Sequence, residues 1–153
     1  MNESLDDTLG FAIAQTGRNL NHLMFALLKP FDITPEQWVV LKRLGEHNEI
    51  SQKDLASISQ KNQTTLTRIL DLLIGKGLVQ KKMSKDDRRS FLIEQTVQGR
   101  RLQQEIAPVV EDIYQGMMNR IPEDQFTTFK QVLSQINQGI DEAFQTKRGA
   151  QKE

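Results

Sequence analysis

The chain has 153 residues, of which 37% are hydrophobic and 26% charged, a balance typical of a folded, soluble globular protein. No apolar run approaches the roughly 20 residues that a membrane-spanning helix needs, and the first residues lack the basic and apolar stretches of a secretion signal. Because there is no cysteine, disulfides, thiolate metal sites and thiol redox sensing are excluded, and we expect a cytoplasmic protein.

The charges are distributed unevenly along a chain whose formal net charge is zero. Between Lys61 and Arg101 there are ten Lys and Arg against four Asp and Glu, a net charge of +6, which leaves −6 on the remainder. A basic middle between acidic ends is typical of a local binding site for a polyanion. Charge alone leaves a solvated charged surface equally open.

Two helices are predicted first. Apolar residues at helical spacing indicate one from about Leu5 to Lys29, and Pro30 ends it. Thr34 caps the second, with Pro35 in its first turn and Gln37 reaching back to the cap. We expect the buried side of this second helix to consist of Trp38, Val39, Leu41 and Leu44.

A short helix, a polar break at residues 59–62 and a fourth helix follow. Ser51 and Asp54 form a capping-box pattern at the start of the short helix. The fourth helix runs to about Lys76, where Gly77 can adopt the left-handed conformation that ends a helix. The inward residues expected in the short helix are Leu55, Ala56 and Ile58. The apolar stripe of the fourth consists of Leu66, Ile69, Leu70 and Leu73.

Two strands and two long helices complete the order. Strands at 78–83 and 90–95 are joined by a charged turn, and a long helix runs from Thr96 to about Asn119. In the last helix, apolar residues are spaced 3-4-3-4-3, the period of a coiled-coil seam. These seam residues are Phe126, Phe129, Leu133, Ile136, Ile140 and Ala143.

This order predicts a mainly α fold, a winged helix-turn-helix with long N- and C-terminal dimerisation helices and a small β-hairpin wing. We expect one domain over 1–153, with the winged helix-turn-helix lobe at about 34–100 and dimerisation helices at about 1–30 and 101–147. The flanking helices are too apolar along one stripe for so small a centre to cover, so a homodimer is expected. Its predicted interface contains Leu9, Ile13, Ile113, Phe126, Phe129, Leu133, Ile136 and Ile140.

The outer face of the fourth helix carries short polar side chains and long cations. These side-chain types contact phosphates and base edges in the major groove, where the N-terminal residues of an inserted helix contact the bases. A solvated helix face is the alternative. The candidate recognition residues are Lys61, Gln63, Thr64, Thr65 and Arg68.

The charged hairpin is the second candidate DNA contact. Its cations repel one another unless an anionic partner is present, and Asp87 can orient the guanidinium of Arg89 for the minor groove. A charged tip that keeps the hairpin soluble is the alternative. The candidate wing residues are Lys82, Lys85, Asp87, Arg88 and Arg89.

These motifs together resemble the MarR family of bacterial regulators over nearly the whole chain. The resemblance rests on the runs 67–70, 76–79 and 86–89, followed by Ile93, Thr96 and Gly99. The family's wing signature falls on Asp87, Arg89, Ile93, Gln95 and Thr96. The chain departs from the pattern at Gln95, where an apolar residue is expected, and at Ile74–Gly75, where a charged pair is usual.

The resemblance implies a homodimeric transcription regulator, typically a repressor, on a pseudo-palindromic operator in double-stranded DNA. It further implies interlocked first, fifth and sixth helices, autoregulation, and release by a small aromatic or lipophilic anionic effector. For a crevice between the dimer helices and the DNA lobe, the candidate ligand residues are His22, Phe25 and Trp38. An ordinary core or interface role for these three remains the alternative.

Other classes of function lack motifs in this sequence. We find no catalytic residues, no phosphate-binding glycine loop and no cofactor motif. His22 and His47 are the only histidines, so no metal site is expected. A winged-helix module that binds protein or RNA remains the alternative function.

Overall fold

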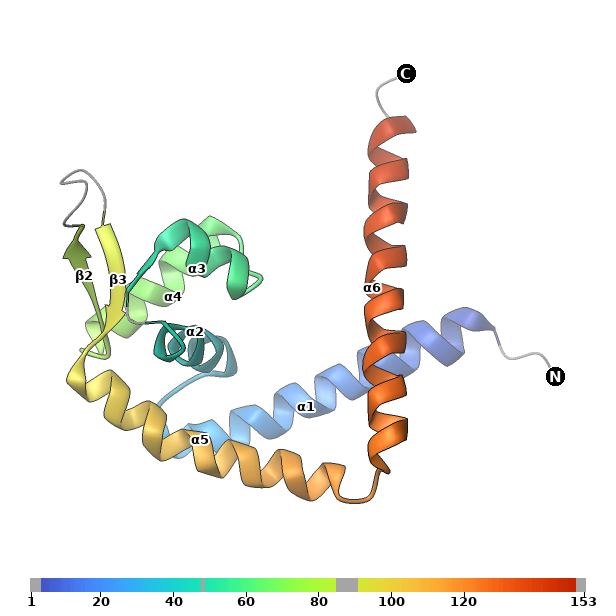
Figure 1. Ribbon diagram of the computed structural model, residues 1–153, viewed down its shortest axis with the longest axis horizontal. Coiled ribbons are helices and arrows are strands. Elements are labelled where there is room, and N and C mark those ends of the chain that lie inside the picture. The colour runs from blue at the N-terminus through green and yellow to red at the C-terminus, as the bar shows by residue number, and fades with distance from the viewer. Residues whose placement is uncertain (1–3, 48, 85–90, 151–153) are drawn as a thin grey trace. The chain divides into compact units, whose positions relative to one another are not determined.

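The computed structural model describes residues 4–47, 49–84 and 91–150, and Figure 1 shows the order of their elements. A π-helical turn (Asp6–Phe11) leads into α1 (Ala12–Leu28) and a 3-10 turn (Lys29–Phe31). The remaining helices are α2 (Pro35–Gly45), α3 (Gln52–Ile58), α4 (Gln63–Gly75), α5 (Val97–Met118) and α6 (Glu123–Ala150). The strands are β1 (Ile50–Ser51), β2 (Val79–Met83) and β3 (Phe91–Gln95).

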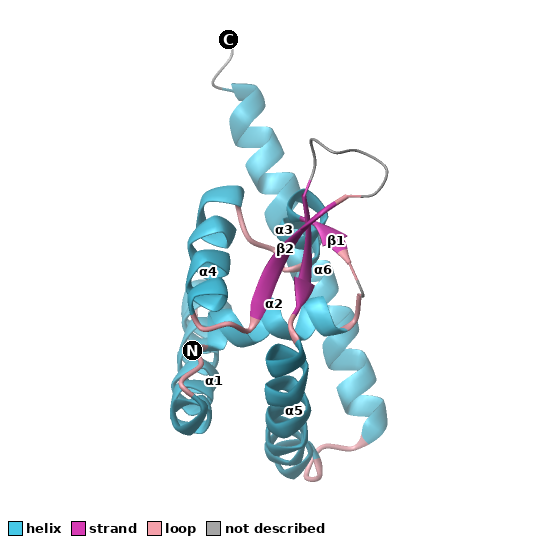
Figure 2. Ribbon diagram, turned by 90° about the vertical axis from the view of Figure 1, so that its left-hand side faces the viewer, coloured by secondary structure: helices cyan, strands magenta, loops and turns pink. Residues whose placement is uncertain are grey.

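The strands form one antiparallel sheet in the order β1-β3-β2. Ile50 pairs with Ile93, and Val79 pairs with Gln95. Helices α2 and α4 pack against this sheet, which is magenta in Figure 2. The predicted mainly α, winged helix-turn-helix architecture is confirmed, with β1 as a third, very short strand.

The chain divides into two compact units, Met1–Val110 and Glu111–Glu153. The first contains the helix-turn-helix, the sheet and the first turns of α5, and the second contains the end of α5 and all of α6. The expected single domain over 1–153, with its lobe at 34–100 and dimerisation helices at 1–30 and 101–147, stays a prediction.

The hydrophobic core of the first unit is formed mainly by α2, α4 and the sheet. The predicted α4 stripe is confirmed, because Leu66, Ile69, Leu70 and Leu73 are all at most 2% exposed. Two predictions of burial were wrong. Val40 and not Val39 is buried in α2, because Val40 shares a helix face with Leu44, one turn later. In α3, Ile58 is exposed because Ser59, one turn after Leu55, occupies the inward position.

Helices α4 and α3 are each followed by a residue in the left-handed conformation. The amide after that residue donates a hydrogen bond back to a carbonyl in the last turn of the helix. Gly77 has φ 72°, and the amide of the next residue, Leu78, donates to the Leu73 carbonyl at 3.0 Å, as predicted for Gly77. Gln60 has φ 52° after α3, and the Lys61 amide donates to the Ala56 carbonyl at 3.0 Å. This second closure turns the chain from α3 into α4.

The start of α5 is joined closely to the end of α4 and the start of β2. The Thr96 hydroxyl donates to the Gly77 carbonyl at 2.6 Å and accepts from the Gly99 amide at 3.0 Å. The Thr96 amide donates to the Leu78 carbonyl at 3.0 Å. A Cβ on Gly99 would lie 2.0 Å from the Leu78 carbonyl oxygen, so this backbone contact requires glycine.

Gln95, the departure from the family pattern, is 5% exposed, and its amide nitrogen makes two hydrogen bonds. Its Nε2 donates to the Leu41 carbonyl in α2 at 2.7 Å and also to Oε1 of Gln103 in α5. A buried amide is tolerated when its hydrogen bonds are made. Gln95 therefore connects β3 with two helices by polar contacts where an apolar residue was expected.

We expect Gly99→Ala to lower the free energy of unfolding by roughly 1–3 kcal/mol, because the added methyl group forces a backbone shift. Urea denaturation followed by circular dichroism measures this change. Gly116→Ala is the control in the same helix, since a Cβ there meets nothing within 4 Å. That control should raise stability by about 0.4–1 kcal/mol. Equal effects of the two substitutions would contradict the close contact.

Candidate nucleic-acid interface

The N-terminus of α4 is held by a side-chain cap. Asn62 is extended, and its Oδ1 accepts from the Thr65 amide at 2.8 Å. Such a cap satisfies one of the free amides in the first helical turn. The residues predicted to contact bases therefore begin at a defined helix end and not in a frayed turn.

The outer face of α4 presents most of the predicted recognition residues. Gln63, Thr64 and Arg68 are exposed, whereas Thr65 and Lys61 are partly buried at the edge of that face. An open depression on the same face is lined by Thr64, Thr67, Arg68, Asp71 and Leu72. Sequence reasoning omitted Thr67, although its position one turn after Thr64 could have identified it.

Thr67 also connects the two helices of the helix-turn-helix. Its hydroxyl accepts from Nε2 of Gln52 in α3 at 2.7 Å and donates to the Gln63 carbonyl at 2.8 Å. The bond to Gln52 restrains the rotation of α4 relative to α3, and the bond to Gln63 holds the Thr67 hydroxyl within α4. The outward face of α4 is thus set by polar contacts as well as by the core.

Glu36 of α2 lies against both cations of the predicted recognition surface. Its Oε1 is 3.9 Å from Nζ of Lys61, and its Oε2 accepts a hydrogen bond from Nη2 of Arg68 at 3.5 Å. The Arg68 side chain nonetheless remains 67% exposed. Sequence reasoning missed Glu36, because it precedes Arg68 by 32 residues and only the packing of α2 on α4 brings them together.

Lys82 in β2 is paired with two carboxylates. It forms an ion pair and hydrogen bond with Glu49, and Glu94 on the neighbouring strand lies 3.7 Å away. The hydrogen bond and charge of Glu49, followed by the charge of Glu94, raise the pKa of the Lys82 ammonium above its ordinary value. The wing role of Lys82 stays a prediction. The other wing candidates, Lys85, Asp87, Arg88 and Arg89, lie outside the described residues.

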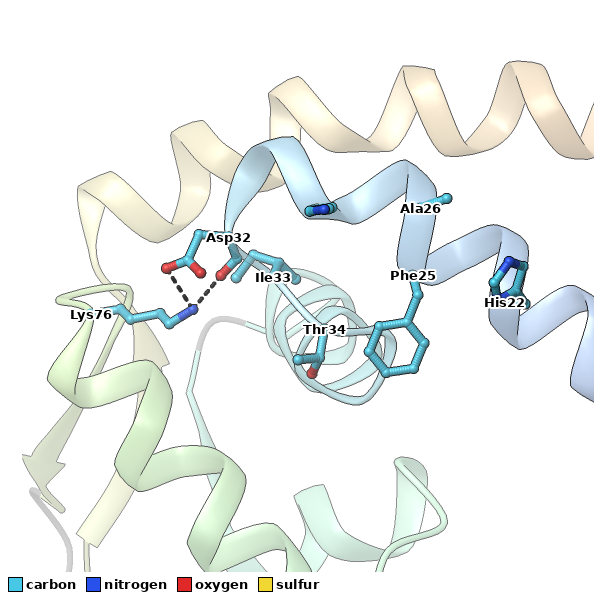
Figure 3. Close-up of a pocket in the computed structure, with 8 residues that line it drawn as sticks. His22, Phe25, Ala26, Asp32, Ile33, Thr34 and Lys76 are labelled. Atoms are coloured by element: carbon cyan, nitrogen blue, oxygen red, sulfur yellow. Dashed lines mark hydrogen bonds and ion pairs between the residues drawn. The ribbon is translucent and has the colours of Figure 1, made fainter.

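A hollow of about 340 Å³ lies between the end of α1, the start of α2 and the end of α4. His22 and Phe25, two of the predicted ligand residues, line it, as do Lys29 and Lys76. Figure 3 shows Lys76 reaching across to Asp32, whose carboxylate lies 2.9 Å from the Lys76 ammonium. Trp38 belongs to the core and not to the lining of this hollow.

Apolar side chains remain exposed along the predicted dimer helices. Leu9 and Ile13 in the N-terminal segment are exposed, and so are Phe129 and Ile140 in α6. The partly buried members of the predicted interface are Ile113, Phe126, Leu133 and Ile136. Their assignment to a dimer interface stays a prediction.

In the part of the chain that the structure describes, no helix combines the length and apolar character needed to span a bilayer. The same residues contain no group of three or more His, Cys, Asp or Glu side chains that could hold a metal ion.

The fold and the outer face of α4 define a winged helix-turn-helix protein. The family model described as MarR family matches residues 33–91. Over these residues the chain is similar to the MarR family, and this similarity places it among DNA-binding transcription regulators and not among enzymes.

Two curated proteins and a solved structure are similar to this chain. The chain is 26% identical to the multiple antibiotic resistance protein MarR of Escherichia coli (strain K12), over 84% of this chain and 90% of that protein. It is also 26% identical to the HTH-type transcriptional regulator FarR of Neisseria gonorrhoeae, over 72% of this chain and 75% of that protein. The crystal structure of the S. aureus MepR-DNA complex shares the fold, with a TM-score of 0.82 and 22% identity over 90% of this chain and 99% of that one.

Proposed function

We propose that this protein binds a pseudo-palindromic operator in double-stranded DNA as a homodimer and represses transcription until a small anionic effector releases it. The observation that carries the proposal is the capped helix α4, which presents Thr64 and Arg68 on its exposed face. Hydroxyl and guanidinium groups at the start of such a helix are suited to phosphates and base edges in the major groove. The S. aureus protein MepR, which has the same fold, crystallised as a complex with DNA.

Footprinting on the DNA upstream of the protein's own gene tests the operator directly. We expect two protected half-sites about 10 base pairs apart, because two-fold related recognition helices enter successive major grooves. Arg68→Ala should weaken binding by roughly 1–3 kcal/mol. Arg43→Ala is the control, since Arg43 lies in the last turn of α2 and pairs with Glu46, 2.9 Å away. Equal affinity of wild type and Arg68→Ala would contradict the recognition role.

A competition experiment distinguishes DNA binding from the alternative function, a module that binds RNA or protein. A duplex RNA of the operator sequence should not displace the DNA, because the deep, narrow major groove of A-form RNA excludes side chains. Operator affinity should also fall steeply with salt, since each neutralised phosphate contributes about −0.9 to the logarithmic slope. Displacement by the RNA at similar concentration would favour the alternative.

For the homodimer, we expect Leu133→Asp to raise the dissociation constant at least roughly 100-fold, or about 3 kcal/mol, because a buried unpaired carboxylate is costly. Sedimentation velocity at micromolar concentration measures the change, with circular dichroism confirming the helix content. Gln131→Asp adds the same charge on the opposite side of α6 and serves as the control. A folded Leu133→Asp dimer as tight as wild type would contradict the predicted seam.

The effector part of the proposal rests on the hollow beside α1. Its volume of about 340 Å³ lies within the range of small-molecule sites. Phe25 offers an aromatic face, and Lys29 and Lys76 offer positive charge to an anion. Because Lys76 follows α4 directly, an anion that competes with Asp32 for Lys76 would act on the end of the recognition helix.

Benzoate is the probe for this site. We expect benzoate to release operator DNA from the wild type, and Lys29→Gln to require roughly tenfold more, because a charge-assisted hydrogen bond is worth about 1.5–3 kcal/mol. Lys42→Gln removes one exposed positive charge from α2, outside the hollow, and is the matched control. Fluorescence anisotropy of labelled operator measures release. Identical benzoate dependence of the two variants would contradict this binding site.

A further inference from the structure

No motif in the sequence indicated a functional role for Glu36. It lies in the first turn of α2, and its two carboxylate oxygens face different cations. Oε1 is 3.9 Å from the Lys61 ammonium, and Oε2 is 3.5 Å from Nη2 of Arg68. Lys61 precedes the Asn62 cap of α4 and Arg68 is in its second turn, so one carboxylate spans the start of the recognition helix.

The contact with Glu36 limits the orientations of the Arg68 side chain but leaves most of that side chain exposed. An arginine has five N–H donors in a planar fork, and the hydrogen bond to Glu36 uses Nη2 while the side chain stays 67% exposed. A free arginine on a helix can swing toward any phosphate. An arginine oriented through one edge by a carboxylate keeps its other donors in a fixed plane, as bidentate contact with a base edge requires.

The negative charge of Glu36 also favours base contacts over phosphate contacts. A phosphate that approaches Lys61 or Arg68 from the side of α2 meets a carboxylate already there, and like charges repel. A base edge carries no net charge and meets no such repulsion. Glu36 therefore weakens phosphate contacts, which DNA of any sequence offers, more than base contacts, which depend on the sequence.

We propose that Glu36 is a positioning and specificity-determining residue of the DNA-binding surface, which orients Arg68 for base contact and disfavours its use as a general phosphate binder. This rests on the proposed binding of operator DNA through α4. The residue acts through Arg68 and Lys61 and makes no contact with DNA of its own.

The experiment compares the affinity for the footprinted operator with that for a scrambled duplex of equal length and composition. Glu36→Gln should lower this ratio roughly tenfold, because base discrimination by Arg68 weakens while binding to scrambled DNA strengthens. Glu36→Asp keeps the charge but shortens the side chain, so it should lower the ratio too. An Asp variant that behaves as wild type would overturn the positioning role.

Two controls separate orientation from general charge. Glu46→Gln removes the same charge from the opposite end of α2, where Glu46 pairs with Arg43, and should leave the ratio unchanged. In an Arg68→Ala background, Glu36→Gln should change the ratio much less, because only its effect through Lys61 remains. Thermal unfolding of each variant verifies the fold.

The outcomes distinguish the inference from the function on which it rests. A wild-type protein that does not prefer its operator over scrambled DNA overturns the proposed function, and the role of Glu36 with it. A wild type that prefers the operator, with a Glu36→Gln variant that shifts both affinities equally, overturns the role of Glu36 alone. A lower ratio for Glu36→Gln and Glu36→Asp, but not for Glu46→Gln, supports it.

Discussion

The burial of one apolar stripe on α4 is the constraint on which the rest of the site depends. Leu66, Ile69, Leu70 and Leu73 are almost completely buried, and each such side chain contributes roughly 1.5–3 kcal/mol when removed from water. Because a helix with one side in the core must turn its opposite side to solvent, the same packing exposes Thr64 and Arg68. The DNA-binding surface is a consequence of the hydrophobic core.

Polar contacts set the relative positions of the helices and the sheet more closely than hydrophobic packing alone. The closure at Gln60 and the Asn62 cap define where α4 begins, and the Thr67 hydroxyl joins α4 to α3. Gln95 and Thr96 do the same for the sheet and α5. Among these side chains Gln95 is buried, and leaving its amide unpaired would be costly. The helix-turn-helix, the sheet and the start of α5 are therefore fixed relative to one another by specific bonds.

Carboxylates accompany the cations of this basic region. Glu36 faces Lys61 and Arg68, and Glu49 and Glu94 surround Lys82. Exposed ion pairs of this kind contribute only about 0–1 kcal/mol each to stability, so their main effect is on where the cations point and what they bind. The charge available to DNA on the described surface is consequently smaller than the count of Lys and Arg suggests.

The sequence by itself determined the order of elements, the caps at Thr34 and Ser51, the end of α4 at Gly77 and the buried stripe of that helix, because these depend on local periodicity and backbone preferences. Local patterns could not identify Val40 as the buried valine, the use of Gln95 or the position of Glu36 beside Arg68. Those features depend on contacts between residues far apart in the chain. Only the packing of α2 against α4 and the sheet decided them, because burial and electrostatic pairing follow distance in space and not separation in sequence.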